Sequence, residues 1–121
     1  MIYVYNRTKE THEGPNNYPI FRGGSILGNP YTHIKNKTTL ASYVVRTRDE
    51  AIELYDHYFD VMYSGNIEYK KLIDEIYEKY KNGIDVYLEC YCAPLRCHGD
   101  IIKEKLQKRL IKERIKMHKQ V

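Results

Sequence analysis

The clearest structural signal in this chain lies at residues 84–107, IDVYLECYCAPLRCHGDIIKEKLQ. Apolar side chains alternate from Ile84 to Cys92, which predicts a strand with one apolar face. Ala93 to Gly99 predicts a turn, and a final helix is expected to start near Asp100. We expect this strand to bury Ile84, Val86, Leu88, Cys90 and Cys92, and the helix to bury Ile102, Leu106, Leu110 and Ile115. Such a strand–turn–helix is half of a parallel-sheet unit, in which ligands bind beyond the carboxyl ends of the strands.

Shorter strands are expected before this stretch. Ile2 to Tyr5 is β-branched and aromatic, which favours a first strand. Asn6 to Asn17 is polar and predicts a loop. Tyr18 to Arg22 predicts a strand at a sheet edge, because Pro19 has no N–H to donate to a neighbour. Leu40 to Arg46 fits either a short strand or the approach to the next helix.

Two helices are expected between the early strands and the late one. Thr47 and Glu50 fit a capping box at the start of the first helix. Its apolar residues at helical spacing are Ala51, Tyr55, Tyr58, Phe59 and Met62, and Ser64-Gly65-Asn66 ends it. The second helix has an apolar face made by Tyr69, Leu72, Ile73, Ile76, Tyr77 and Tyr80, and Asn82-Gly83 ends it.

These elements predict the α/β class: a small single domain with a short, mostly parallel sheet flanked by helices and a C-terminal strand–turn–helix. The chain has 121 residues, which is enough for one core and too few for two. Its 42% hydrophobic and 30% charged residues are ordinary for a globular protein and argue against disorder. We expect an α/β core at residues 1–107 and a basic helical extension at residues 108–121.

The positive charge is concentrated at the C-terminal end. Residues 101–121 hold eight Lys or Arg against two Glu, whereas the whole chain has a net charge of only +4. The basic side chains are Lys103, Lys105, Lys108, Arg109, Lys112, Arg114, Lys116 and Lys119. Because they spread around most of a helix, a solvated helix is the simplest interpretation. Contact with nucleic acid phosphates or with a protein partner is the alternative.

Cysteine content and hydropathy predict a cytoplasmic protein. Three cysteines are an odd number and do not suggest a disulfide framework. No apolar run approaches the roughly 20 residues that span a bilayer, so no membrane partner is expected. Residues 1–7 resemble no signal peptide. The sequence is silent on oligomeric state, and a homo-oligomer is compatible with it.

Three chemistries compete for the cysteine–histidine cluster at residues 90–100. Cys90, Cys92, Cys97 and His98 have the atom types of a structural zinc site, although their spacing is unusual for one. Cys97 at a helix start would have a lowered pKa, with His98 as an acid or base beside it. In the third interpretation, Cys90 and Cys92 are buried packing residues, while His98 and Asp100 cap the helix. Zinc therefore stays one of three options, and no cofactor is specified.

Residues 22–30 combine a cation with three glycines, a hydroxyl and an amide. Glycines let backbone amides approach an anion closely. The loop matches neither the P-loop pattern nor Gly-x-Gly-x-x-Gly. A turn that needs positive φ angles explains its glycines equally well.

Taken together, these segments resemble a known family. Residues 22–31 (Arg-Gly-Gly-Ser…Gly-Asn-Pro-Tyr), 46–55 and 88–102 (with Cys-Tyr-Cys-Ala-Pro…Cys-His-Gly-Asp) occur in the order found in the phage and bacterial family called domain of unknown function 4326. The resemblance covers roughly Tyr18 to Leu106. It implies that residues 22–31 and 90–100 form one pocket, and it brings no established reaction. A phage origin is implied as well.

The resemblance, with the residue chemistry, implies a pocket for a nucleotide-derived small molecule. Arg and amides suit a phosphate, Asn and Asp suit ribose or base edges, and Tyr can stack on a base. The expected ligand-binding residues are Arg22, Gly24, Ser25, Gly28, Asn29, Tyr31 and Cys97. If the protein is an enzyme, His98 is the expected acid or base and Asp100 its orienting partner. The protein would either bind the ligand or process it. For a phage protein, the expected purpose is to counter host nucleotide signalling. The alternative is a zinc-stabilised nucleic-acid or protein interaction module that uses the basic C-terminal helix.

Overall fold

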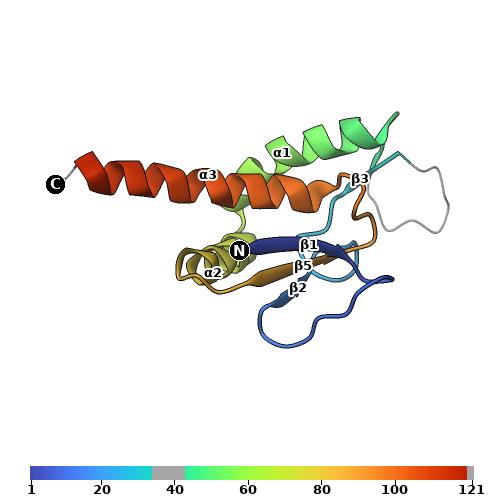
Figure 1. Ribbon diagram of the computed structural model, residues 1–121. Coiled ribbons are helices and arrows are strands. Elements are labelled where there is room, and N and C mark those ends of the chain that lie inside the picture. Colours follow the sequence, from blue (N-terminus) through green and yellow to red (C-terminus); the bar gives the residue numbers. More distant parts are fainter. Residues whose placement is uncertain (34–42, 120–121) are drawn as a thin grey trace.

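The computed structural model describes residues 1–33 and 43–119 (Figure 1). The elements are β1 (Ile2–Asn6), β2 (Asn17–Pro19), β3 (Tyr31–Thr32), β4 (Tyr43–Val44), α1 (Arg48–Gly65), α2 (Ile67–Lys81), β5 (Val86–Cys90) and α3 (His98–Lys119). A three-stranded sheet has the order β1-β5-β2, and all its strands are parallel. The predicted α/β class with a small parallel sheet is therefore confirmed. Part of the ambiguous stretch, residues 40–42, lies outside the described residues, as do residues 120–121.

The strand expected at residues 84–92 is the centre of this sheet. Val86, Leu88 and Cys90 are buried, as the alternation predicts. The strand is shorter than expected at both ends. The Ile84 N–H donates to the Lys79 carbonyl at the end of α2, which leaves Ile84 40% exposed. The Cys92 carbonyl accepts from Leu95 in the following turn, so Cys92 lies beyond the ladder.

The expected edge strand is β2, and Pro19 is its last residue. An edge position tolerates a residue with no N–H, because only one side of the strand has a neighbour. The Ile20 N–H still donates to the Glu89 carbonyl at 2.9 Å. The chain then leaves the sheet, so Phe21 and Arg22 lie beyond its carboxyl edge.

Helix α1 begins and ends where the sequence predicts, and α2 ends at the predicted Asn82. The Thr47 hydroxyl caps α1 by accepting from the Glu50 N–H at 3.1 Å. Asn66 ends α1 and caps α2, where its side-chain oxygen accepts from the Tyr69 N–H at 3.0 Å. In the core between them, the Tyr55 hydroxyl contacts the Tyr69 hydroxyl at 2.7 Å. Tyr55 also donates to the Leu27 carbonyl at 2.8 Å, which ties α1 to the glycine-rich loop.

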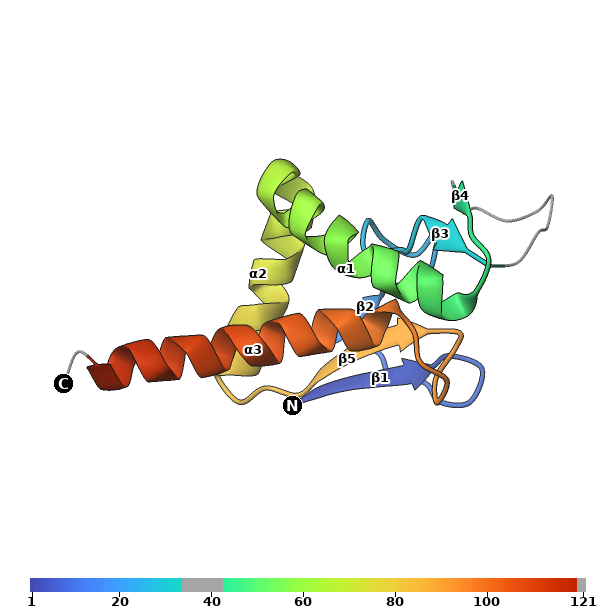
Figure 2. The same cartoon turned by 90° about the horizontal axis from the view of Figure 1, so that it is seen from above.

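Helix α3 crosses one face of the sheet beside α1, and its C-terminal end extends past the strands (Figure 2). Ile102, Leu106 and Leu110 are buried as expected. The expectation for Ile115 is wrong, because it is 51% exposed on the part of α3 that projects beyond the sheet. The expected boundary after Gln107 falls inside this continuous helix. No helix within residues 1–33 and 43–119 has the length and apolar character needed to span a membrane.

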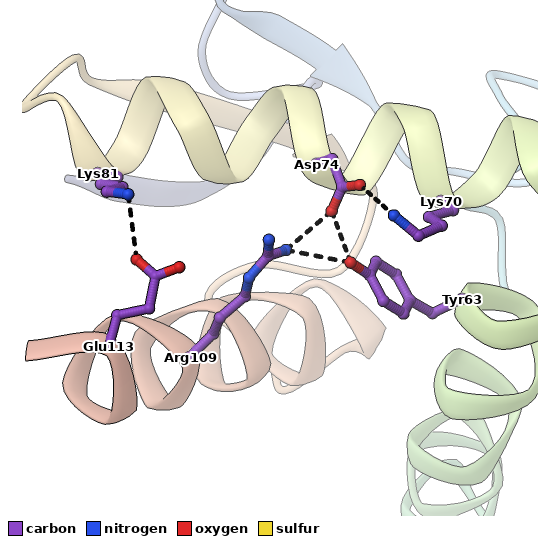
Figure 3. Close-up of polar contacts among 6 residues, drawn as sticks. All are labelled: Tyr63, Lys70, Asp74, Lys81, Arg109 and Glu113. Atoms are coloured by element: carbon purple, nitrogen blue, oxygen red, sulfur yellow. Dashed lines mark hydrogen bonds and ion pairs between the residues drawn. The ribbon is translucent and has the colours of Figure 1, made fainter. Parts of the chain in front are cut away.

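Polar contacts fix α3 against α2 (Figure 3). The Asp74 carboxylate of α2 accepts from Tyr63 Oη at 2.7 Å, Lys70 Nζ at 2.7 Å and Arg109 Nη1 at 2.8 Å. Partial burial raises the pKa of Asp74, but the hydrogen bonds from Lys70, Tyr63 and Arg109 outweigh it and hold this pKa at about 2. The guanidinium of Arg109 also lies 3.8 Å from the centre of the Tyr77 ring. This cluster joins α3 to α2 and to Tyr63 near the end of α1.

We predict that Asp74→Asn lowers the free energy of unfolding by about 1–2 kcal/mol at pH 7, because Arg109 loses its charged partner. The depressed pKa places this contribution above about pH 4 and removes it as the pH falls toward 2. Urea unfolding at several pH values measures it. Asp85→Asn is the control, since Asp85 pairs with the terminal amine at an exposed site and is expected to cost about 0.5 kcal/mol or less. Equal losses for both variants would contradict the prediction.

Candidate functional site

A cavity of about 340 Å³ lies beyond the carboxyl ends of β2 and β5. Figure 2 shows that the first turns of α1 and α3 lie on this same side of the molecule. Residues from both stretches singled out in the sequence line it: Arg22 and Asn29 from one, and Cys90, Cys92, Cys97 and His98 from the other. The glycine-rich loop and the cysteine–histidine segment therefore meet at one cavity.

Arg22 holds the loop that forms one wall. Its Nη1 donates to the carbonyls of Asn29 and Tyr31, each at 3.2 Å. The side chain is half-buried and lines the cavity. Carbonyl oxygens have no formal charge, so these two contacts do not neutralise the positive charge that Arg22 brings to the cavity wall.

Asn29 joins the same loop to α1. Its Nδ2 donates to the Ala51 carbonyl at 3.1 Å, and its Oδ1 accepts from the Tyr31 N–H at 3.0 Å. The side chain is only 5% exposed. Asn29 thus lines the cavity but uses most of its hydrogen-bonding capacity to fix the wall, and one Nδ2 hydrogen remains for a ligand.

The other predicted loop residues do not line the cavity. A Cβ at Gly24 would lie 2.9 Å from the Phe21 ring, so only glycine fits there. The Ser25 hydroxyl donates to the Pro19 carbonyl at 2.5 Å. The Gly28 N–H donates to the Ser25 carbonyl at 3.3 Å. Tyr31 stacks on Tyr43 with ring centres 5.4 Å apart. These residues stabilise the loop on the side away from the cavity. Their role as ligand contacts stays a prediction.

The start of α3 has a capping box in which a thiol replaces the usual hydroxyl. Cys97 Sγ accepts from the Gly99 N–H at 3.3 Å, and Asp100 Oδ2 accepts from the Cys97 N–H at 3.0 Å. A Cβ at Gly99 would lie 2.8 Å from the Ile20 side chain, so glycine lets the helix start approach the sheet. Asp100 therefore has a structural task. It does not line the cavity, and α3 begins two residues earlier than expected.

His98 is buried at the cavity, with 8% of its surface exposed. Its Nε2 lies 2.6 Å from the Ile20 carbonyl oxygen, which can only accept, so Nε2 carries the proton and Nδ1 is the acceptor. Burial is the main cause that lowers the pKa of His98 to about 4. The ring is therefore neutral at pH 7. The Ile20 carbonyl, and not the Asp100 carboxylate, accepts the hydrogen bond that orients it.

Cys90 and Cys97 interact directly in the cavity wall. The hydrogen bond from the Cys97 thiol lowers the pKa of Cys90, and the same contact raises the pKa of Cys97. Cys90 Sγ also accepts from the Ala93 N–H at 3.4 Å. The sequence pointed to Cys97 as the thiol of lowered pKa. Because two adjacent thiols cannot both ionise easily, they titrate as a pair, and Cys97, which donates in their hydrogen bond, is the thiol that keeps its proton.

The predicted zinc ligands all line the cavity, but they do not form a metal site. Within residues 1–33 and 43–119, no group of three His, Cys, Asp or Glu side chains is placed to hold a metal ion. A tetrahedral zinc centre needs its donor atoms gathered around one point, and among the described residues Cys90, Cys92, Cys97 and His98 are not gathered in this way.

Two arginines that sequence reasoning missed complete the cavity wall. Arg48 is the first residue of α1, and Arg96 lies in the turn before α3. Together with Arg22 they give the wall three guanidinium groups, and no carboxylate lines it in the part of the chain that the structure describes. Nothing in the spacing marks Arg48 and Arg96 as partners, because they are 48 positions apart and meet only in the folded protein.

These features define a class: small parallel α/β proteins with a positively charged cavity at the carboxyl edge of the sheet. The chain belongs to the family described as domain of unknown function 4326, whose model matches residues 4–108. The match starts earlier than the resemblance noted from the sequence, since it includes most of β1. No curated protein and no solved structure matches the chain.

We predict that the buried neutral imidazole makes stability depend on pH. The pKa of His98 is about 4 in the folded protein and 6.5 in a free chain, so the unfolded chain binds the proton first. Stability should fall by about 2 kcal/mol between pH 7 and pH 5. His98→Gln keeps a donor for Ile20 but does not titrate, and should remove most of this loss in urea unfolding. His57→Gln, at an exposed position, is the control and should retain it. An unchanged pH profile in His98→Gln would refute the assignment.

Proposed function

We propose that this protein binds a nucleotide-derived small molecule in the cavity between residues 22–31 and 90–100. The observation that carries the proposal is the charge of the wall, which Arg22, Arg48 and Arg96 line and to which no carboxylate of the described residues contributes. A cavity of about 340 Å³ is within the usual range for small-molecule sites. Guanidinium groups bind phosphate through paired N–H donors.

The location of the cavity supports the same ligand class. It lies at the carboxyl ends of parallel strands, where α/β proteins commonly bind nucleotides. The first turns of α1 and α3 contribute Ala51, Ile52 and His98 to its wall. Helix starts carry partial positive charge, which favours an anion.

Aromatic side chains offer a surface for the base. Phe21 and Tyr91 line the cavity and contact each other edge to face, with ring centres 5.2 Å apart. The Arg7 guanidinium lies over both rings, at 4.7 Å and 5.3 Å. Tyr91 is 53% exposed, so this pair belongs to the open side of the cavity. A base that stacks there would leave its phosphate inside.

The same site serves either binding alone or turnover. In an enzyme, the acceptor Nδ1 of neutral His98 would take a proton from the ligand. Product that still forms with Cys97→Ala but not with His98→Ala would identify this role. In a binding protein, intact ligand would be recovered after heat denaturation. A phage protein in the host cytoplasm that removes or breaks a nucleotide signal is the setting we propose.

The alternative is a nucleic-acid or protein interaction module built on α3. Lys108, Lys112 and Lys116 line one groove along this helix. Asp60 and Glu113 line it too, but cations are in excess, which favours a polyanion. Two other cations of the helix are already neutralised. Lys105 pairs with Asp56 and Asp60, and Arg109 pairs with Asp74. Because Leu110 is buried, truncation after Gln107 would damage the core, and substitution of the three lysines is the cleaner test.

We predict that calorimetric titration with adenine and guanine nucleotides, NAD and ADP-ribose detects binding to the wild-type protein. Phe21→Leu should weaken it about five- to hundredfold, because the flat ring is lost while an apolar side chain remains. A variant with Lys108, Lys112 and Lys116 all changed to Gln should bind as the wild type does. Loss of nucleic-acid binding in the lysine variant, with no small-molecule binding in any protein, would favour the alternative and reject the proposal.

A further inference from the structure

We infer that Arg48 and Arg96 together bind the terminal phosphate of the ligand in this cavity. The cavity then binds phosphate monoesters more tightly than nucleosides or phosphodiesters. This inference deepens the proposed function and rests on it for the place where the ligand binds. It assigns a direct role to two residues, Arg48 and Arg96, that are not among the ligand contacts expected from the sequence. Arg22, by contrast, has the structural role of holding the loop at residues 22–31.

The three guanidinium groups differ in what they already contact. Arg22 donates to the carbonyls of Asn29 and Tyr31 and holds the loop. Arg48 and Arg96 form no ion pair within residues 1–33 and 43–119. Residues 34–42, IKNKTTLAS, contain no Asp or Glu that could supply one. Among the described residues, Arg48 and Arg96 are therefore the guanidinium groups of the cavity wall that form neither an ion pair nor a hydrogen bond, whereas Arg22 is held by two carbonyls.

The surroundings add to this positive charge. Arg48 opens α1, and Arg96 lies two residues before α3, so both stand near the positive ends of helix dipoles. The acidic residues of the same turns are used elsewhere or lie off the cavity wall. Glu50 pairs with Arg46 at 3.5 Å, and Asp100 accepts from the Cys97 N–H. Asp49 does not line the cavity. An anion would relieve this local repulsion.

The number of free cations favours a particular ligand class. A phosphate monoester carries close to two negative charges at pH 7, and each guanidinium can hold two of its oxygens. A phosphodiester carries one charge and would leave one arginine unbalanced. A nucleoside carries none and would leave both unbalanced. Two unpaired arginines therefore match a terminal phosphate, as in a nucleoside monophosphate.

Calorimetric titration of the full chain with adenosine 5′-monophosphate, cyclic AMP, adenosine and inorganic phosphate tests the inference. We expect the monophosphate to bind at least tenfold more tightly than adenosine or cyclic AMP. Arg48→Gln and Arg96→Gln should each weaken monophosphate binding about tenfold or more, and should leave adenosine binding unchanged. Arg114→Gln, an exposed arginine of α3 outside the cavity, is the matched control and should bind as the wild type does.

Melting temperatures separate this role from a structural one. Without ligand, Arg48→Gln and Arg96→Gln should melt no lower than the wild type, because each removes repulsion. Inorganic phosphate should raise the melting temperature of the wild type and of Arg114→Gln more than that of the two cavity variants. A lower melting temperature with unchanged monophosphate affinity would overturn the inference.

The outcomes distinguish this inference from the proposed function. If inorganic phosphate binds through Arg48 and Arg96 but no nucleotide binds more tightly, the phosphate site stands and the nucleotide proposal falls. If adenosine and its monophosphate bind equally well and independently of both arginines, the nucleotide proposal stands and the phosphate site falls. If no compound binds, both are rejected.

Discussion

The hydrogen-bond ladder that joins β5 to both β1 and β2 is the constraint on which the cavity depends. Because all three strands are parallel, their carboxyl ends lie at one edge of the sheet. The segments that follow β2 and β5 must therefore leave the sheet side by side. This geometry brings Arg22 and Arg96 to the same cavity from positions 74 residues apart. A shift of β5 in its register would separate the two walls.

Most polar groups at this edge hold the walls in place. Asn29 fixes the loop to α1, while Cys97 and Asp100 cap α3. His98 is held by the Ile20 carbonyl through Nε2, which leaves Nδ1 as its acceptor. These contacts are made in the protein alone, so this part of the wall is formed before a ligand binds. A preorganised wall loses little entropy on binding. The groups that would gain a partner are the arginines.

The sequence predicted those features that depend on local periodicity and capping. The alternation around Leu88 identified the central strand, and Thr47 identified the start of α1. The exposure of Ile115 could not be predicted in this way, because helical spacing does not show where a helix extends beyond the core. Arg48 and Arg96 were missed for a related reason. Each lies near a helix start with no local pattern that marks it as a ligand contact, and only the tertiary fold brings the two side chains to one cavity.

The distribution of carboxylates separates the two charged surfaces of this protein. On α3, Lys105 pairs with Asp56 and Asp60, and Arg109 pairs with Asp74. Glu113 of the same helix pairs with Lys81 at 3.2 Å. These pairs stabilise helix contacts and reduce the charge that a polyanion would meet. At the cavity the acidic partners are missing from the wall that the structure describes. Unbalanced charge in a confined space costs stability, since neighbouring like charges repel. Such a cost is expected where a protein must receive an anion, and this difference favours the cavity over the basic helix as the functional site.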